Sequence, residues 1–189
     1  MFRRCLAAIR LENNSSQVGE SACYRMETTR HFTATVYVVH DGATALHEHE
    51  RLEMWLPPGG HVDRDELPHE AATREAREEL GLDVSLVAET GDIDSLHARS
   101  IPKPQHFLLE DINVHEGGVG HQHIDFVYYG LVASRDIDPV PGEAPADAWE
   151  WFTAAEIEER TDLLEPDVRQ PALEALGTVS ELTAPSDSR

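Results

Sequence analysis

Residues 60–82 read GHVDRDELPHEAATREAREELGL. Small and apolar side chains recur at helical spacing in the second half of this stretch, at Ala72, Ala76 and Leu80. Gly81 follows directly, where a helix commonly ends on a residue in the left-handed conformation. We therefore predict a helix over residues 66–80 whose apolar stripe packs against a sheet.

Three glutamates lie on the helix face next to that stripe. At 100° per residue, Glu75, Glu78 and Glu79 fall within an arc of about 100°. Like charges at this spacing repel each other and destabilise a helix. A hard divalent cation, which prefers carboxylate oxygens, would relieve the repulsion and suits phosphate chemistry. A solvated acidic face is the alternative interpretation of the same three residues.

The wider pattern favours the metal site. Residues 60–82 resemble the Nudix box, G-x5-E-x7-R-E-U-x-E-E-x-G-U, where U is a bulky aliphatic residue. The positions that match in register are Gly60, Glu66, Arg74, Glu75, Glu78, Glu79, Gly81 and Leu82. Ala76 departs from the pattern, because a larger aliphatic side chain is usual there. The chain is thus identified as a member of the Nudix (MutT-like) hydrolase family, and the order of its strands and helices over residues 30–176 is also similar.

The resemblance implies a metal-dependent enzyme. Nudix hydrolases cleave the pyrophosphate of a nucleoside diphosphate linked to another group, with Mg²⁺ or Mn²⁺ as the cofactor. By likeness, the metal ligands are Glu75, Glu78, Glu79 and the Gly59 carbonyl, and Glu75 or Glu79 is the catalytic residue that takes a proton from water. The residues expected to support the site are Gly60, Glu66, Arg74 and Gly81.

The sequence leaves the residues outside the box open. His121, His123 and Asp125 share one face of a predicted strand, where they could hold a metal, touch a phosphate or form a polar surface. Acidic residues that compete for the same role are Glu110, Asp111, Glu116 and Glu143, and two histidines that could line the cleft are His31 and His61. Arg99 and Lys103 form a small cationic island. The loop that carries them could bind phosphate or could have no role in the site. The candidate substrate-binding residues are Arg99, Lys103, His123 and Asp125.

The rest of the chain predicts an α/β fold. Strands are expected near residues 31–39, 43–50, 54–56, 84–89, 107–114, 123–132 and 149–152, with helices at 153–160 and 166–176. The expected architecture is a Nudix-type α/β/α sandwich with a mixed sheet, in which the box forms a loop-helix-loop. We place the domain at residues 29–178 and a flexible tail at 179–189. Residues 1–28 are expected to be a disordered N-terminal extension. Alternatively, the true start is Met26 rather than Met1, and residues 1–25 lie upstream of it.

The charge balance limits which classes of partner are expected. The chain has 36 Asp and Glu residues against 15 Lys and Arg, a net charge of −21, and Lys103 is its single lysine. Such a charge repels nucleic acids and anionic membranes, so we expect neither as a partner. Acid-rich, lysine-poor surfaces are typical of halophilic proteins. No apolar run reaches the length of a membrane span or a secretory signal, which indicates a cytoplasmic protein.

The predicted function is hydrolysis of a pyrophosphate bond in a small nucleoside diphosphate derivative, such as a nucleotide sugar, a dinucleotide or a nucleoside triphosphate. The alternative is a non-catalytic Nudix-fold domain that binds nucleotides or regulates another protein. Such domains usually lose box glutamates, whereas this chain keeps them. Family members are often dimers, so a homodimer is the expected assembly.

Overall fold

The structure is a computed structural model that describes residues 28–49, 54–115 and 118–184. The expectations for residues 1–27, including the choice between Met1 and Met26, lie outside the described residues. Strands occur at β1 (Thr29–His40), β2 (Ala43–His49), β3 (Met54–Leu56), β4 (Gly59–His61), β5 (Ser85–Leu86), β6 (His106–His115), β7 (Gly118–Leu131) and β8 (Trp149–Thr153). Helices occur at α1 (Pro68–Leu80), α2 (Ala154–Glu159) and α3 (Pro166–Thr183), with a short 3₁₀ turn, η1, at Ala146–Ala148.

The eight described strands form one mixed sheet centred on β1. The sheet runs in the order β3-β2-β1-β7-β5, while β4 pairs with β1, β6 with β7 and β8 with β2. β1 is parallel to β7 and antiparallel to β2 and β4. Asp41 and Gly42 connect β1 to β2 with φ of 46° and 74°, as a two-residue hairpin requires. This hairpin joins the two strands expected near residues 31–39 and 43–50.

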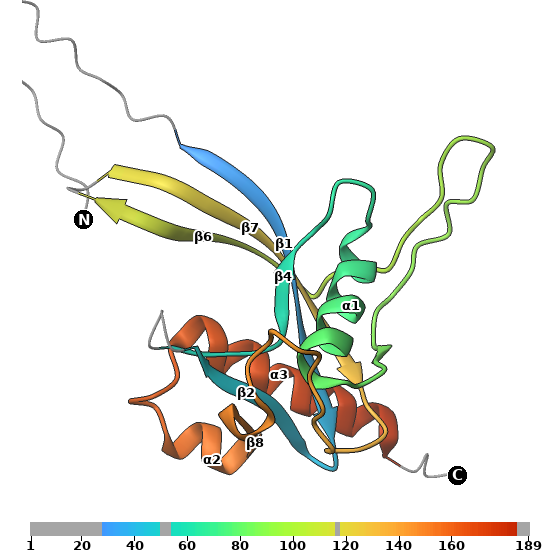
Figure 1. Ribbon diagram of the computed structural model, residues 1–189. Coiled ribbons are helices and arrows are strands. Elements are labelled where there is room, and N and C mark those ends of the chain that lie inside the picture. The colour runs from blue at the N-terminus through green and yellow to red at the C-terminus, as the bar shows by residue number, and fades with distance from the viewer. Residues whose placement is uncertain (1–27, 50–53, 116–117, 185–189) are drawn as a thin grey trace, which may run out of the picture.

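Two hydrophobic cores lie on opposite faces of this sheet. The alternating side chains of β1 point to both, because successive residues of a strand face opposite ways. Val36 and Val38 pack with the α1 stripe on one face, and Tyr37 and Val39 pack with α3 on the other. Figure 1 shows α1 and α3 on either side of the sheet, which is the predicted α/β/α sandwich. Ala72, Ala76 and Leu80 are fully buried, as the helical spacing predicts.

The box helix begins two residues later than predicted. Leu67 has the extended backbone of an N-cap, and Pro68 occupies the first turn, where its missing N–H costs little. The Leu67 N–H donates to Glu70 Oε2 at 2.9 Å. Glu66 consequently precedes the helix, and its carboxylate can accept hydrogen bonds from another side chain.

Other boundaries also differ from the prediction. Residues 59–61 form a strand, β4, that the sequence did not indicate because glycines lack strand propensity. β7 begins at Gly118 rather than residue 123, and β5 keeps only two of the six residues predicted for it. α3 continues to Thr183, and Val179 is only 4% exposed, so the first part of the predicted tail belongs to the helical layer.

β6 and the first halves of β1 and β7 extend beyond the helices as a three-stranded arm (Figure 1). β4 pairs with β1 where this arm leaves the domain, through Thr33, Ala34 and Thr35. The root of the arm therefore lies beside the start of the box. Among the described residues, none of the helices has the length and apolar character needed to cross a membrane.

Gly81 provides a test of the box geometry. It has φ 71°, and a Cβ at this position would overlap the carbonyl oxygen of Asp138. We predict that Gly81→Ala lowers the free energy of unfolding by about 1–2 kcal/mol, because the left-handed conformation is strained for residues with a side chain. Urea unfolding measures this change.

Gly177 in α3 is the matched control. A Cβ there meets no atom within 4 Å, and the backbone is helical. Gly177→Ala should therefore raise the free energy of unfolding by about 0.5–1 kcal/mol, the usual helix preference for alanine over glycine. Equal effects of the two substitutions would contradict the proposed strain at Gly81.

Candidate active site

Two of the box glutamates, Glu75 and Glu79, lie against the backbone of β4. The Gly59 N–H donates to Glu79 Oε2 at 3.0 Å. A Cβ on Gly60 would overlap the Glu75 carboxylate, and one on Gly59 would lie 2.8 Å from Thr35 Oγ1. A side chain at either glycine would therefore require a neighbour to move, and the supporting role of Gly60 stays a prediction.

One guanidinium organises the carboxylates around it. Arg74 donates to both oxygens of Glu66, at 2.9 and 3.0 Å, in a bidentate pair. Its Nη1 donates to Glu75 Oε1 at 2.9 Å and to Glu78 Oε2 at 2.8 Å, and its Nη2 donates to the His61 carbonyl at 3.0 Å. Such a rigid fork holds several acceptors in one arrangement. The loop, β4 and helix of the box are thus joined through a single side chain.

The charges at the site are incompletely neutralised. Burial, together with the neighbouring carboxylates of Glu75 and Glu143, raises the pKa of Glu79 to about 8 against the lowering effect of the Gly59 N–H. Burial likewise raises the pKa of Glu75, although Arg74 opposes the shift. The hydrogen bonds from Arg74 lower the pKa of Glu66. A cluster of carboxylates with one cation has the donor chemistry of a Mg²⁺ or Mn²⁺ site.

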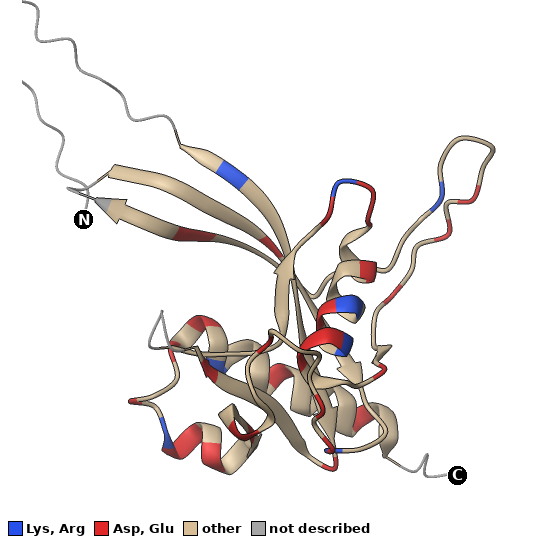
Figure 2. Cartoon of the chain, viewed as in Figure 1, with Lys and Arg blue, Asp and Glu red and all other residues tan. Residues whose placement is uncertain are grey.

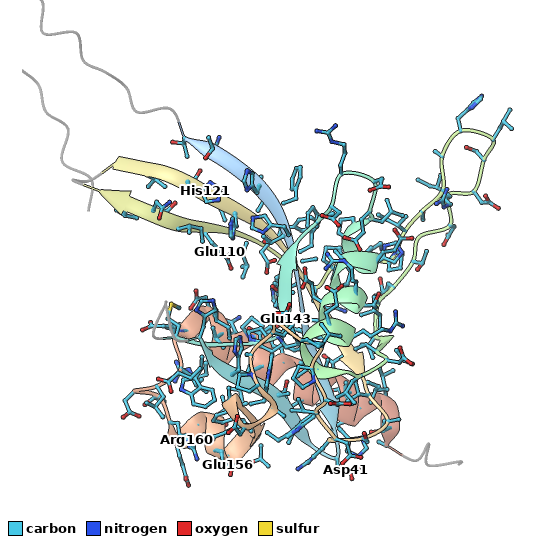
Figure 3. The ribbon with its side chains drawn as sticks, viewed as in Figure 1. Asp41, Glu110, His121, Glu143, Glu156 and Arg160 are labelled. Atoms are coloured by element: carbon cyan, nitrogen blue, oxygen red, sulfur yellow. The ribbon has the colours of Figure 1, made fainter. Side chains whose placement is uncertain are left out.

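A fourth carboxylate comes from outside the box. Asp138 N–H donates to the Leu80 carbonyl at 2.9 Å, and Val140 N–H donates to the Glu78 carbonyl at 2.8 Å. These bonds fasten the following loop to the end of α1 and bring Glu143 toward the glutamates (Figure 3). Glu143 raises the pKa of both Glu75 and Glu79 through its charge. From the sequence, Glu143 was only one of four acidic candidates for a role outside the box, because no local pattern connects it to the box.

His123 and Asp125 of β7 lie on the sheet face that also carries Thr33 of β1. Asp125 is 2% exposed, and its Oδ1 accepts a hydrogen bond from Thr33 Oγ1 at 2.8 Å. His123 Nδ1 lies 3.8 Å from Glu110 Oε2, and burial together with the charges of Asp125 and Asp167 raises the pKa of Glu110 to about 7. Within the part of the chain that is described, no hydrogen bond or ion pair joins this group to the box glutamates. Its substrate-binding role stays a prediction.

The cationic island is separate from the glutamates. Arg99 lines a surface hollow of about 420 Å³ together with Leu67 and residues 94–98, and Lys103 Nζ pairs with Glu89 Oε2 at 3.5 Å. The loop that carries both cations projects on the opposite side of α1 from β4 in Figure 1. Figure 2 shows how few other cations the molecule has and how many acidic residues surround them. Phosphate binding by Arg99 and Lys103 stays a prediction.

Comparison with known proteins gives consistent matches. The family model described as NUDIX domain matches residues 29–173. An RNA pyrophosphohydrolase of Rhizobium meliloti (strain 1021) is 35% identical over 108 residues, which are 56% of this chain and 62% of that protein. The chain thus spans less than two thirds of that relative. An RNA pyrophosphohydrolase of Brucella anthropi is 29% identical over 147 residues, 76% of this chain and 75% of the relative.

Solved structures give the same result. A NUDIX-family hydrolase from Clostridium perfringens superposes with a TM-score of 0.68 at 33% identity, covering 80% of this chain and 99% of that one. A NUDIX hydrolase from Nitrosomonas europaea superposes with a TM-score of 0.54 at 19% identity, covering 85% of this chain and all of that one. The second likeness bears on the fold alone.

Arg74 provides a test of the carboxylate arrangement. Lysine keeps the positive charge but cannot donate as a fork to Glu66, Glu75 and Glu78 together. We predict that Arg74→Lys weakens Mn²⁺ binding by about tenfold or more, as loss of a group that orients metal ligands typically does. Calorimetric titration of Mn²⁺ measures the affinity.

The control is Arg77→Lys. Arg77 lies on the same helix, but its side chain pairs with exposed Asp83 instead of the glutamates. Mn²⁺ affinity should not change in this variant. Unaltered Mn²⁺ binding in Arg74→Lys would show that the fork does not organise the site.

Proposed function

This chain belongs to the Nudix family of hydrolases, and on that premise we propose that it cleaves a pyrophosphate bond in a nucleoside diphosphate derivative. The proposed cofactor is Mg²⁺ or Mn²⁺. The observation that carries the proposal is the arrangement of the three box glutamates. Glu79 accepts from the Gly59 N–H, and the Glu75 carboxylate lies against Gly60. Arg74 donates to both Glu75 and Glu78. A regulatory domain without catalysis has no need of this complete set.

The proposed ligands are Glu75, Glu78 and Glu79, with Glu143 and the Gly59 carbonyl as further oxygen donors. A divalent cation, when bound, would neutralise the charge on the phosphate oxygens and lower the pKa of a bound water. The protein residues supply position: Arg74 holds Glu75 and Glu78, while the Gly59 N–H holds one oxygen of Glu79. Positioning and fixed charges of this kind provide most of the acceleration in phosphoryl chemistry.

Either Glu75 or Glu79 takes the proton from the attacking water in this proposal. Two measurements on each glutamine variant separate the roles. Loss of metal affinity together with rate assigns a ligand, whereas loss of rate with metal affinity retained assigns the proton acceptor.

We expect Glu79→Gln to lower the metal-dependent rate by about 10²-fold or more, because the neutral amide is a poor metal ligand and cannot accept the proton. Circular dichroism should show an intact fold. Glu158→Gln on the exposed surface of α2 is the control and should keep the full rate. Near-normal hydrolysis by Glu79→Gln would remove this residue from the catalytic site.

The substrate class has two candidates. Small nucleoside diphosphate derivatives follow from the family, and the 5′ end of RNA is favoured by the names of the relatives from Rhizobium and Brucella. The net charge of −21 disfavours extended contact with RNA, but contact limited to a terminal phosphate remains compatible with it. The expectation that nucleic acid is not a partner therefore stays a prediction.

A substrate panel tests both candidates. We expect Mg²⁺-dependent cleavage of at least one nucleotide sugar, dinucleotide, nucleoside triphosphate or 5′-triphosphorylated RNA oligonucleotide. Release of nucleoside monophosphate measures cleavage of the first two, and release of phosphate or pyrophosphate measures cleavage of the triphosphates. Preference for the RNA would identify it as the substrate, and no turnover of any member would contradict the hydrolase proposal.

We also infer a salt-rich cytoplasmic setting from the charge, so each substrate is assayed at low and high KCl. Full stability and activity in dilute buffer would contradict that inference.

A further inference from the structure

Four imidazoles meet at the root of the arm. His31 of β1, His61 of β4, and His121 and His123 of β7 form a closed cycle, which we name the histidine quartet. Neighbouring ring centroids are 5.2 Å apart for His31–His61, 5.1 Å for His61–His123, 5.0 Å for His121–His123 and 4.7 Å for His31–His121. Four rings from three strands thus surround one point.

Strand register brings the quartet together. His31 is the parallel partner of His123 on β7, and His121 is two residues away on the same face. His61 is the antiparallel partner of Thr33, which is two residues from His31 on the same face of β1. The chain therefore directs all four side chains to one side of the sheet.

The nitrogen positions fit a metal ion. One nitrogen from each of His31, His61 and His121 lies within 4.8 Å of the other two. His31 Nδ1 and His61 Nε2 are 3.3 Å apart. Two nitrogens bound to one tetrahedral zinc ion, at Zn–N distances of about 2.0–2.1 Å, are also about 3.3 Å apart. A hydrogen bond between His31 and His61 would explain that pair but not the convergence of the third and fourth rings.

A hydroxyl orients one of the rings, and a carboxylate lies near a second. Thr29 Oγ1 lies 2.9 Å from His121 Nδ1, which leaves Nε2 of that ring available to a metal. Glu110 Oε2 lies 3.8 Å from His123 Nδ1. Hydroxyl and carboxylate partners of this kind commonly fix metal-binding histidines. Figure 3 shows His121 and Glu110 on adjacent strands of the arm.

We propose that the histidine quartet binds a transition-metal ion of the Zn²⁺, Co²⁺ or Ni²⁺ class, with His31, His61 and His121 as ligands and the His123 ring packed beside them. Imidazole nitrogen suits these ions, whereas carboxylate oxygen suits Mg²⁺. The site is therefore chemically distinct from the box glutamates. His31 and His61 are exposed, so an ion has access from solvent.

The site connects to the catalytic region through β4. His61 is next to Gly60, and its carbonyl accepts the hydrogen bond from Arg74. An ion bound to His61 and to histidines of β1 and β7 ties β4 to both strands. Occupation of the quartet thus stabilises the backbone against which the box glutamates lie.

Cobalt titration of the metal-free full chain tests the proposal. With Mg²⁺ in large excess to occupy the carboxylates, we expect one Co²⁺ per chain, with visible absorption bands of a nitrogen-rich site. Zn²⁺ should displace the Co²⁺ and raise the melting temperature. The readout does not depend on hydrolysis, so it stands or fails separately from the proposed activity.

Single substitutions identify the ligands. His121→Ala and His31→Ala should each weaken Co²⁺ binding by about tenfold or more, as expected on removal of one ligand. His97→Ala, in the exposed loop beside Arg99, is the matched control and should bind as the wild type does. Circular dichroism of each metal-free variant verifies the fold, and either folded ligand variant suffices for the comparison. Absence of Co²⁺ binding in the wild type, or equal affinity of the His121 and His97 variants, would overturn the proposal.

Discussion

The close contact between β4 and the box helix is the constraint on which the catalytic region depends. Glu79 is held by the backbone N–H of Gly59, and the Glu75 carboxylate occupies the space that a side chain on Gly60 would fill. A Cβ on Gly60 would displace the Glu75 carboxylate, whereas a Cβ on Gly59 would press on Ala34 and Thr35 of β1. Gly60 therefore lets the Glu75 carboxylate come close to the sheet, and the Gly59 N–H fixes one oxygen of Glu79 there.

This proximity concentrates negative charge that the chain must compensate. Arg74 neutralises part of it and at the same time connects Glu66 of the loop, His61 of β4 and Glu78 of the helix. The loop after Val132 then adds Glu143, held in place by backbone bonds to the end of α1. The result is a rigid set of oxygen donors with too few cations, which is what a divalent metal requires.

β4 has a different chemical environment at its two ends. Gly59 and Gly60 face the carboxylates, while His61 belongs to the histidine quartet. Oxygen donors and nitrogen donors prefer different metals, so a three-residue strand separates two potential sites. Their nearness follows from one strand pairing, since β4 is antiparallel to the segment of β1 that follows His31.

The sequence by itself determined the helix, the spacing of Glu75, Glu78 and Glu79, the family and the α/β class. These features depend on periodicity within one element or on a short motif, and both are local. Only the tertiary structure decided that residues 59–61 form a strand, that Glu143 lies close enough to the glutamates to raise their pKa and that Arg99 lines a separate hollow. It likewise brought together histidines separated by up to 92 residues. Such positions depend on strand register and loop closure between distant segments, which no local pattern encodes.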